Sequence, residues 1–96
     1  MEIMVIIKFF SILAEITGFR ELEIPLTNDI MIEDLITIIF SKTNEKFRNY
    51  IANSDGSLKD FITIVLNEKI LSKEDIISKK IVNDDIVAFL TPIEGG

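Results

Sequence analysis

The spacing of apolar residues changes along this chain, and that change restricts it to folds in which a sheet packs against a helix. Residues Ile3–Phe10 are rich in β-branched and aromatic side chains, which is typical of a strand. Further along, apolar residues recur at the spacing of one helix face: Ile32, Leu35, Ile36, Ile39 and Phe40. Ile86–Leu90 again has the character of a short strand. We therefore predict an α+β fold with one central helix.

The strands are expected to have one buried and one partly wet face. One side of the first strand carries Ile3, Val5, Ile7 and Phe9. The other side carries Lys8, so we expect Phe10, which shares that side, to be exposed. A second strand over Arg20–Leu26 contains Pro25, which has no N–H to donate and therefore favours a sheet edge.

The remaining elements are shorter. Ser11 is expected to cap a helix over Ile12–Thr17 that ends at a left-handed Gly18. Residues 45–52 either continue the central helix or form a separate turn. Further segments complete the order: strands over Phe61–Leu66 and Lys69–Leu71, a helical turn within Ser72–Lys80, and a turn at Asn83-Asp84-Asp85. We expect one domain over residues 1–96 with a flexible tail over residues 91–96.

Composition excludes several classes of function. Ten basic and sixteen acidic residues give a net charge of -6, which argues against nucleic acid as a partner. The same charge suits a partner with a basic surface, or solubility alone. Cysteine and histidine are absent, so a disulfide, a zinc–thiolate site or a thiol nucleophile is impossible. No apolar run approaches the about 20 residues of a membrane span, and Glu2 stands where a signal peptide carries positive charge. We expect no membrane partner and a cytoplasmic location.

Two carboxylate pairs were considered as catalytic or metal-binding groups. They are Glu74-Asp75 and Asp84-Asp85. Adjacent residues seldom point at one substrate, so solvated turn residues are the favoured interpretation. We expect no metal site.

The last two residues are the strongest candidate site. The chain has only four glycines, and two of them are Gly95-Gly96 at its end. Alone, this pair also fits an expression scar or a frayed end. Its context favours a functional role, because Pro92 directs the chain out of the last strand in an extended form. Two residues without Cβ then present the terminal carboxylate on a thin arm that can enter a narrow channel in another protein.

The residues just described resemble the ubiquitin-like sulfur carriers of molybdopterin and thiamin synthesis. Three segments carry the resemblance: Ile7-Lys8-Phe9-Phe10 with Leu13-Ala14-Glu15-Ile16-Thr17-Gly18; Ile32-Glu33-Asp34-Leu35; and residues 83–96, which end in Thr91-Pro92-Ile93-Glu94-Gly95-Gly96. The early Phe-Phe and the segment ending in Gly18 are more similar to the molybdopterin synthase small subunit than to the shorter thiamin carrier. Three positions depart from the pattern: Asp84 replaces a glycine, Thr91 replaces a proline, and Met31 replaces a capping Ser or Thr.

The resemblance implies a β-grasp fold, in which a mixed sheet wraps the long helix and its first and last strands lie parallel in the centre. It also implies two protein partners. An E1-like adenylating enzyme would use ATP and a sulfur donor to convert the Gly96 carboxylate to a thiocarboxylate. The large subunit of molybdopterin synthase would receive the arm in a heterotetramer and pass the sulfur to a pyranopterin precursor. The small chain would bind no cofactor itself and would not be catalytic alone.

Two other functions are compatible with the same residues. The terminal chemistry also serves tRNA thiolation, thiamin synthesis or ubiquitin-like conjugation to lysines. Alternatively, the domain is a binding module in which Gly95-Gly96 is incidental. The choice of pathway, the sulfur donor and the oligomeric state in isolation are not readable from the sequence.

Partner docking needs more surface than a thin arm provides. We predict an exposed apolar patch of Phe10 and Leu90 near the arm with Ile70 at its margin, assisted by the arm residues Pro92, Ile93 and Glu94. The competing interpretation puts Phe10 and Ile70 in the core. We also predict an acidic rim of Asp84, Asp85 and Glu94 around the arm, because no basic residue follows Lys80.

Overall fold

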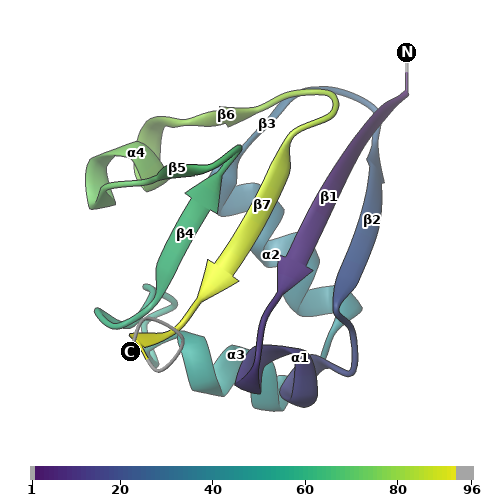
Figure 1. Ribbon diagram of the computed structural model, residues 1–96. Helices are drawn as coiled ribbons and strands as arrows, with labels where there is room; N and C mark the ends of the chain where they lie inside the picture. Colours follow the sequence, from purple (N-terminus) through teal and green to yellow (C-terminus); the bar gives the residue numbers. More distant parts are fainter. Residues whose placement is uncertain (1, 93–96) are drawn as a thin grey trace.

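The protein folds as a five-stranded mixed sheet in the order β2-β1-β7-β4-β5 (Figure 1). The structure is a computed structural model and describes residues 2–92. The strands of this sheet are β1 (Ile3–Phe9), β2 (Glu21–Leu26), β4 (Thr63–Leu66), β5 (Lys69–Ile70) and β7 (Ile86–Leu90). The central pair, β1 and β7, is parallel, and every other pair is antiparallel. The predicted α+β, β-grasp architecture is confirmed.

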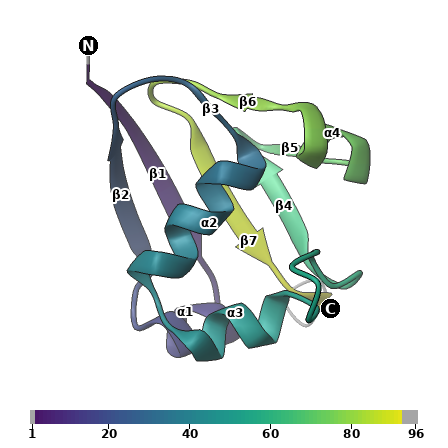
Figure 2. The ribbon, with the colours of Figure 1, turned by 180° about the vertical axis from the view of Figure 1, so that it is seen from behind.

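Helices cover one face of the sheet and one of its ends. The long helix α2 (Ile32–Lys42) crosses the face of the sheet that is turned toward the viewer in Figure 2, and α1 (Ile12–Thr17) and α3 (Glu45–Ile51) lie at the end where β1 and β7 finish. Residues 45–51 form a separate helix because Asn44 is the N-cap of a new helix. The Asn44 side chain accepts a hydrogen bond from the Phe47 N–H at 2.9 Å. The opposite face of the sheet carries no helix among residues 2–92 (Figure 1).

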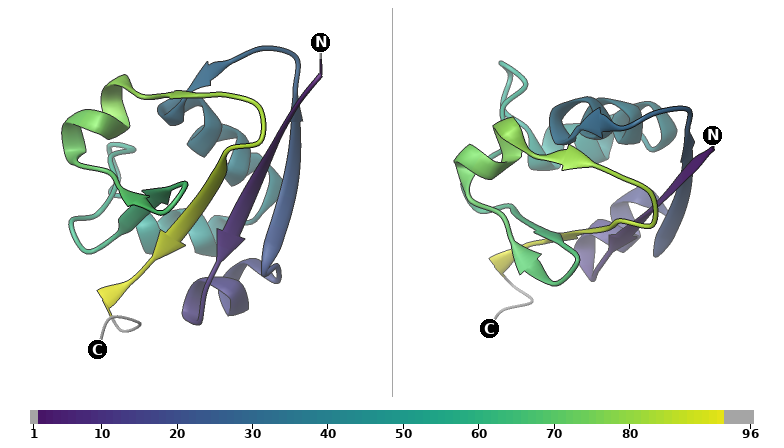
Figure 3. Two further views of the ribbon diagram at one scale, coloured as in Figure 1. Left: turned by 45° about the horizontal axis from the view of Figure 1, so that its top comes forward. Right: turned by 90° about the horizontal axis from the view of Figure 1, so that it is seen from above.

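A small second sheet joins β3 (Ile30–Met31) to β6 (Lys80–Ile81) at the side of the molecule (Figure 3). The sequence did not predict it, since two-residue strands leave no periodic pattern. A backbone contact beside this sheet also explains how α2 begins after Met31 without a side-chain cap. The Ile32 N–H donates to the Lys79 carbonyl at 3.0 Å, so tertiary structure supplies the partner that a Ser or Thr would have given.

Other local predictions divide into confirmed and wrong. Gly18 ends α1 with φ 82°, and Pro25 lies in β2, an edge strand, as expected. Ser11 precedes α1 but its side chain makes no capping hydrogen bond, so that prediction was wrong. The strand predicted over Phe61–Leu66 begins only at Thr63, because the Ile62 N–H closes a turn onto the Lys59 carbonyl at 3.1 Å.

The helical turn predicted within Ser72–Lys80 is α4 (Lys73–Ser78). Its start is a capping box. The Ser72 hydroxyl accepts from the Asp75 N–H, and the Asp75 carboxylate accepts from the Ser72 N–H, both at 3.1 Å. Hydrogen bonding of the Asp75 carboxylate to the Ser72 backbone N–H, and secondly to the Ser72 side chain, holds the pKa of Asp75 below its ordinary value. No helix in the described part of the chain is long and apolar enough to span a membrane.

The core is organised around Phe47. Its fully buried ring contacts Phe9 of β1, Phe89 of β7 and Phe40 of α2, with centroid distances of 5.3, 5.9 and 6.0 Å. All three contacts are edge-on, an arrangement that aromatic quadrupoles favour. The helix α3 is thereby fixed to both central strands at the end where the arm departs.

Replacing Phe47 by Ala should reduce the free energy of unfolding by about 3–5 kcal/mol, since it opens a cavity between three rings. The matched control is Phe19→Ala, because Phe19 is 40% exposed. Urea denaturation should show a loss of no more than about 1 kcal/mol for the control. Equal losses in the two variants would contradict this account of the core.

Candidate functional site

The terminal arm leaves the sheet from the end of β7, beside the end of its parallel neighbour β1 (Figure 1). Thr91 is only 4% exposed, although it was assigned to the flexible tail, so the folded domain extends through this residue. Pro92 is exposed. The other predicted arm residues, Ile93, Glu94, Gly95 and Gly96, lie outside the described residues.

The predicted faces of β7 are confirmed. Val87 and Phe89 are 1% and 0% exposed, whereas Leu90 is half-buried and faces the open side of the sheet. Phe10 is 42% exposed and Ile70 is 68% exposed, so the interpretation of these two as core residues is wrong. Their role in partner binding stays a prediction.

Strand register shows how far this open face extends. One row of paired residues crosses all five strands: Glu21, Lys8, Ala88, Val65 and Ile70. Strands lie about 4.8 Å apart, so Ile70 is about 14 Å from Lys8 across the sheet. Leu90 lies two rows closer to the arm, opposite Thr63 and on the same face of the sheet as Ala88. The patch thus runs diagonally from Phe10 and Leu90 at the arm to Ile70 at the far edge.

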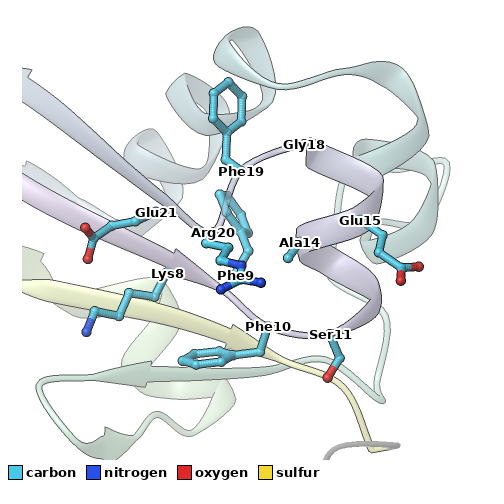
Figure 4. Close-up of a pocket in the computed structure, with 10 residues that line it drawn as sticks. All are labelled: Lys8, Phe9, Phe10, Ser11, Ala14, Glu15, Gly18, Phe19, Arg20 and Glu21. Carbon is cyan, nitrogen blue, oxygen red and sulfur yellow. The ribbon is translucent and has the colours of Figure 1, made fainter.

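A groove of about 820 Å³ lies beside Phe10, between the end of β1 and α1. Figure 4 shows the Arg20 guanidinium between the rings of Phe10 and Phe19 in this view. Lys8 also lines the groove, and neither cation makes an ion pair in the described part of the chain. No sequence pattern pointed to Arg20 or Phe19, because only the turn between α1 and β2 places them in the lining of this groove.

The predicted acidic rim is wrong for Asp84 and Asp85. Both precede β7, whereas the arm follows it, so the five-residue strand separates them by about 16 Å. Asp85 is not a solvated turn residue either, being 7% exposed. Its carboxylate accepts hydrogen bonds from the Asn67 side-chain amide and the Val82 N–H, both at 2.8 Å. Asp85 therefore fastens the start of β7 to the β4–β5 turn.

Asp84 occupies the left-handed region with φ 69°, the conformation that glycine adopts most easily. An aspartate tolerates it better than most residues, which explains how the turn forms without the glycine. Neither carboxylate pair joins a larger cluster. Among residues 2–92, no group of three or more Asp or Glu could hold a metal ion.

The sheet order and the central parallel pair together define a protein with the ubiquitin-like β-grasp fold. The model of the ThiS family matches residues 7–96, nearly the whole chain. The chain belongs to this family of ubiquitin-like sulfur carriers. A comparison with curated protein sequences gives no match.

Several solved structures have the same fold, and three of them illustrate the likeness. SAMP1 of Haloferax volcanii aligns with a TM-score of 0.82 at 22% identity, covering 97% of this chain and 99% of that one. A Pyrococcus furiosus protein assigned as molybdopterin converting factor subunit 1 gives 0.69 at 22% identity, covering 93% and 97%. Urm1 of Sulfolobus solfataricus gives 0.66 at 22% identity, covering 90% and 97%. At these identities the likeness establishes the fold alone.

Asp85→Ala should lower the free energy of unfolding by about 1–3 kcal/mol, because it leaves the Asn67 amide and the Val82 N–H without their acceptor. Asp84→Asn is the control, since asparagine keeps the size and tolerates the left-handed turn. Its expected change is below about 0.5 kcal/mol by chemical denaturation. If Asp85→Ala left the free energy of unfolding unchanged, the buried carboxylate would not hold the turn.

Proposed function

We propose that this protein carries sulfur as a thiocarboxylate on Gly96 and donates it in molybdopterin synthesis, as the small subunit of molybdopterin synthase. The observation that carries the proposal is the position of Gly95-Gly96, six residues past the central strand β7 at the end of a ThiS-family match that runs through residue 96. The sequence has no cysteine, so sulfur bound to the chain requires another atom, and the terminal carboxyl carbon is the one that activation makes available.

The chemistry begins on an E1-like adenylating enzyme. The Gly96 carboxylate attacks the α-phosphate of ATP, pyrophosphate leaves, and an acyl-adenylate forms. A sulfur nucleophile from the donor then attacks the carbonyl carbon and AMP leaves. Glycine suits this step because a chain without Cβ lets the carbonyl approach another backbone closely. The small chain supplies the carboxyl group and the docking surface, and its partners supply catalysis.

The open face of the sheet provides the docking surface that the arm needs. Ordering the arm costs about 1–2 kcal/mol per residue, and apolar burial elsewhere must offset that cost. Phe10 and Leu90 supply apolar area on that open face next to the arm, and Ile70 extends it to the far edge of the sheet. We propose that the E1-like enzyme and the synthase large subunit use this face in turn, with Pro92, Ile93 and Glu94 entering the partner's channel. Both steps would take place in the cytoplasm.

The molybdopterin pathway is favoured by the early Phe9-Phe10 pair and the α1–Gly18 segment, which is similar to the synthase small subunit. A second candidate is a ubiquitin-like modifier or a carrier for tRNA thiolation or thiamin synthesis. The modifier is kept as the second candidate because structures with the same fold include a small archaeal modifier protein as well as a molybdopterin converting factor subunit. The assay below separates the pathways.

Removing Gly96 should abolish thiocarboxylate formation and leave the fold intact, because the terminal residue lies beyond the buried Thr91. Mass spectrometry after incubation with the activating enzyme, ATP and a sulfur donor measures the product. The control, Glu94→Ala, keeps the arm length and should still be thiocarboxylated. Formation of a thiocarboxylate on a chain that lacks Gly96 would contradict the proposal.

Leu90→Glu should weaken binding to the synthase large subunit at least about tenfold by placing a charge in the apolar contact. The change in unfolding free energy should stay within about 1 kcal/mol, since Leu90 is half-buried on the open face. Ile77→Glu is the control, because Ile77 is 64% exposed on α4, away from that face. Calorimetric titration and a molybdopterin-formation assay with the purified large subunit give the result, and wild-type failure in that assay would favour another pathway.

A further inference from the structure

A second groove, of about 440 Å³, lies at the end of the molecule opposite the arm. One wall is the turn between β4 and β5, and the other is the segment from Lys79 to Val82 that contains β6. The buried Asp85 joins the walls, because it accepts one hydrogen bond from Asn67 and one from Val82. The groove is therefore fixed in shape before any ligand arrives.

The rim of this groove is positively charged in a chain whose net charge is -6. Lys69, Lys79 and Lys80 line it, and none of the three makes an ion pair within 4.0 Å in the described part of the chain. Asp75, in the first turn of α4, is near enough to Lys69 and Lys79 to interact with their charges, so three lysines outnumber two carboxylates at this groove. The single carboxylate in the lining is Asp85, which faces hydrogen-bond donors. The groove beside Phe10 differs, since its lining holds as many carboxylates, Glu15 and Glu21, as cations, Lys8 and Arg20. Charge thus directs an anionic ligand to the lysine-lined groove.

The groove is also partly apolar. Leu66 and Leu71, which are 6% and 7% exposed, contribute to its lining together with the exposed Val82. A well-matched occupant is therefore a slender segment with one aliphatic side chain and two negative charges. The arm of this chain has that composition: Ile93 is aliphatic, Glu94 and the terminal carboxylate are negative, and Gly95-Gly96 is thin.

The arm cannot reach the groove of its own molecule. Four residues follow Pro92, and fully extended they span about 14 Å. The groove lies at the start of β7, and the strand alone occupies about 16 Å, to which Thr91 and Pro92 add further length. A contact between arm and groove must therefore join two molecules head to tail.

We propose that the groove lined by Lys69, Lys79 and Lys80 binds the C-terminal arm of a second copy of this chain. Ile93 contacts the apolar lining, and the Glu94 and Gly96 carboxylates face the lysines. The contact is small, with a dissociation constant on the order of 1 mM. It shields the arm where the protein is concentrated and releases it to a partner that also uses the open face of the sheet. The inference is independent of the pathway that the carrier serves.

NMR titration of the ¹⁵N-labelled full chain with the synthetic hexapeptide Thr-Pro-Ile-Glu-Gly-Gly tests this. Amide shifts are expected at Asn67, Lys69 and Lys79–Val82. The double variant Lys69→Glu/Lys79→Glu should weaken binding at least about tenfold, whereas the matched Lys42→Glu/Lys46→Glu variant, on α2 and α3, should bind like the parent. Binding should also fall with added salt, which keeps the test decisive if the groove variant does not fold.

Peptide controls separate the arm from any other acidic segment. A hexapeptide with glutamine in place of glutamate and an amidated C-terminus should bind at least about tenfold more weakly, because both charges are lost. A scrambled hexapeptide of the same composition should bind more weakly than the arm sequence. Equal binding by the scrambled peptide, shifts confined to the groove beside Phe10, or no shifts at all would overturn the proposal.

Discussion

The parallel pairing of β1 with β7 is the contact on which the rest of this structure depends. It joins the first and last strands of the chain, with Ile6 opposite Ile86 and Phe9 opposite Phe89. Parallel neighbours cannot be joined by a tight turn, so everything between them must form one long crossover. That crossover contains β2, the helices and the β4–β5 hairpin. Because the paired strands run in one direction, Phe10 and the arm emerge at the same end.

The ends of β7 have opposite physical characters. At its start, the buried Asp85 ties the strand to Asn67 and Val82. At its finish, Phe89 packs on Phe47 and Phe9, Thr91 is buried, and the chain becomes exposed at Pro92. A rigid strand held at both ends gives the arm a fixed point of departure. A partner that binds the open face therefore meets the arm at a fixed starting position. Only the residues after Pro92 remain to be ordered on binding.

The two ends of the domain differ in character, with the arm at one end and a lysine-lined groove at the other. Family membership rests on the match over residues 7–96, a range that includes the arm. The lysines around the second groove come from segments that are separate in sequence, with Lys69 on β5 and Lys80 on β6. The groove is locally positive although the net charge of the chain is -6. Net charge alone is therefore a poor guide to the charge of a binding partner.

Local patterns in the sequence determined the strands, the central helix, the faces of β1 and β7 and the candidate arm. Alternation and helical spacing are short-range properties, so Val87 and Phe89 could be assigned to the core and Phe10 and Leu90 to the open face without coordinates. Tertiary structure decided what depends on long-range approach. It paired β3 with β6, supplied Lys79 as the partner of the α2 N-terminus, buried Asp85, and removed the Asp84-Asp85 turn from the arm. It also gathered Lys69, Lys79 and Lys80 around one groove, because β5 and β6 belong to different sheets and the hydrogen bonds of Asp85 to Asn67 and Val82 bring the two segments together.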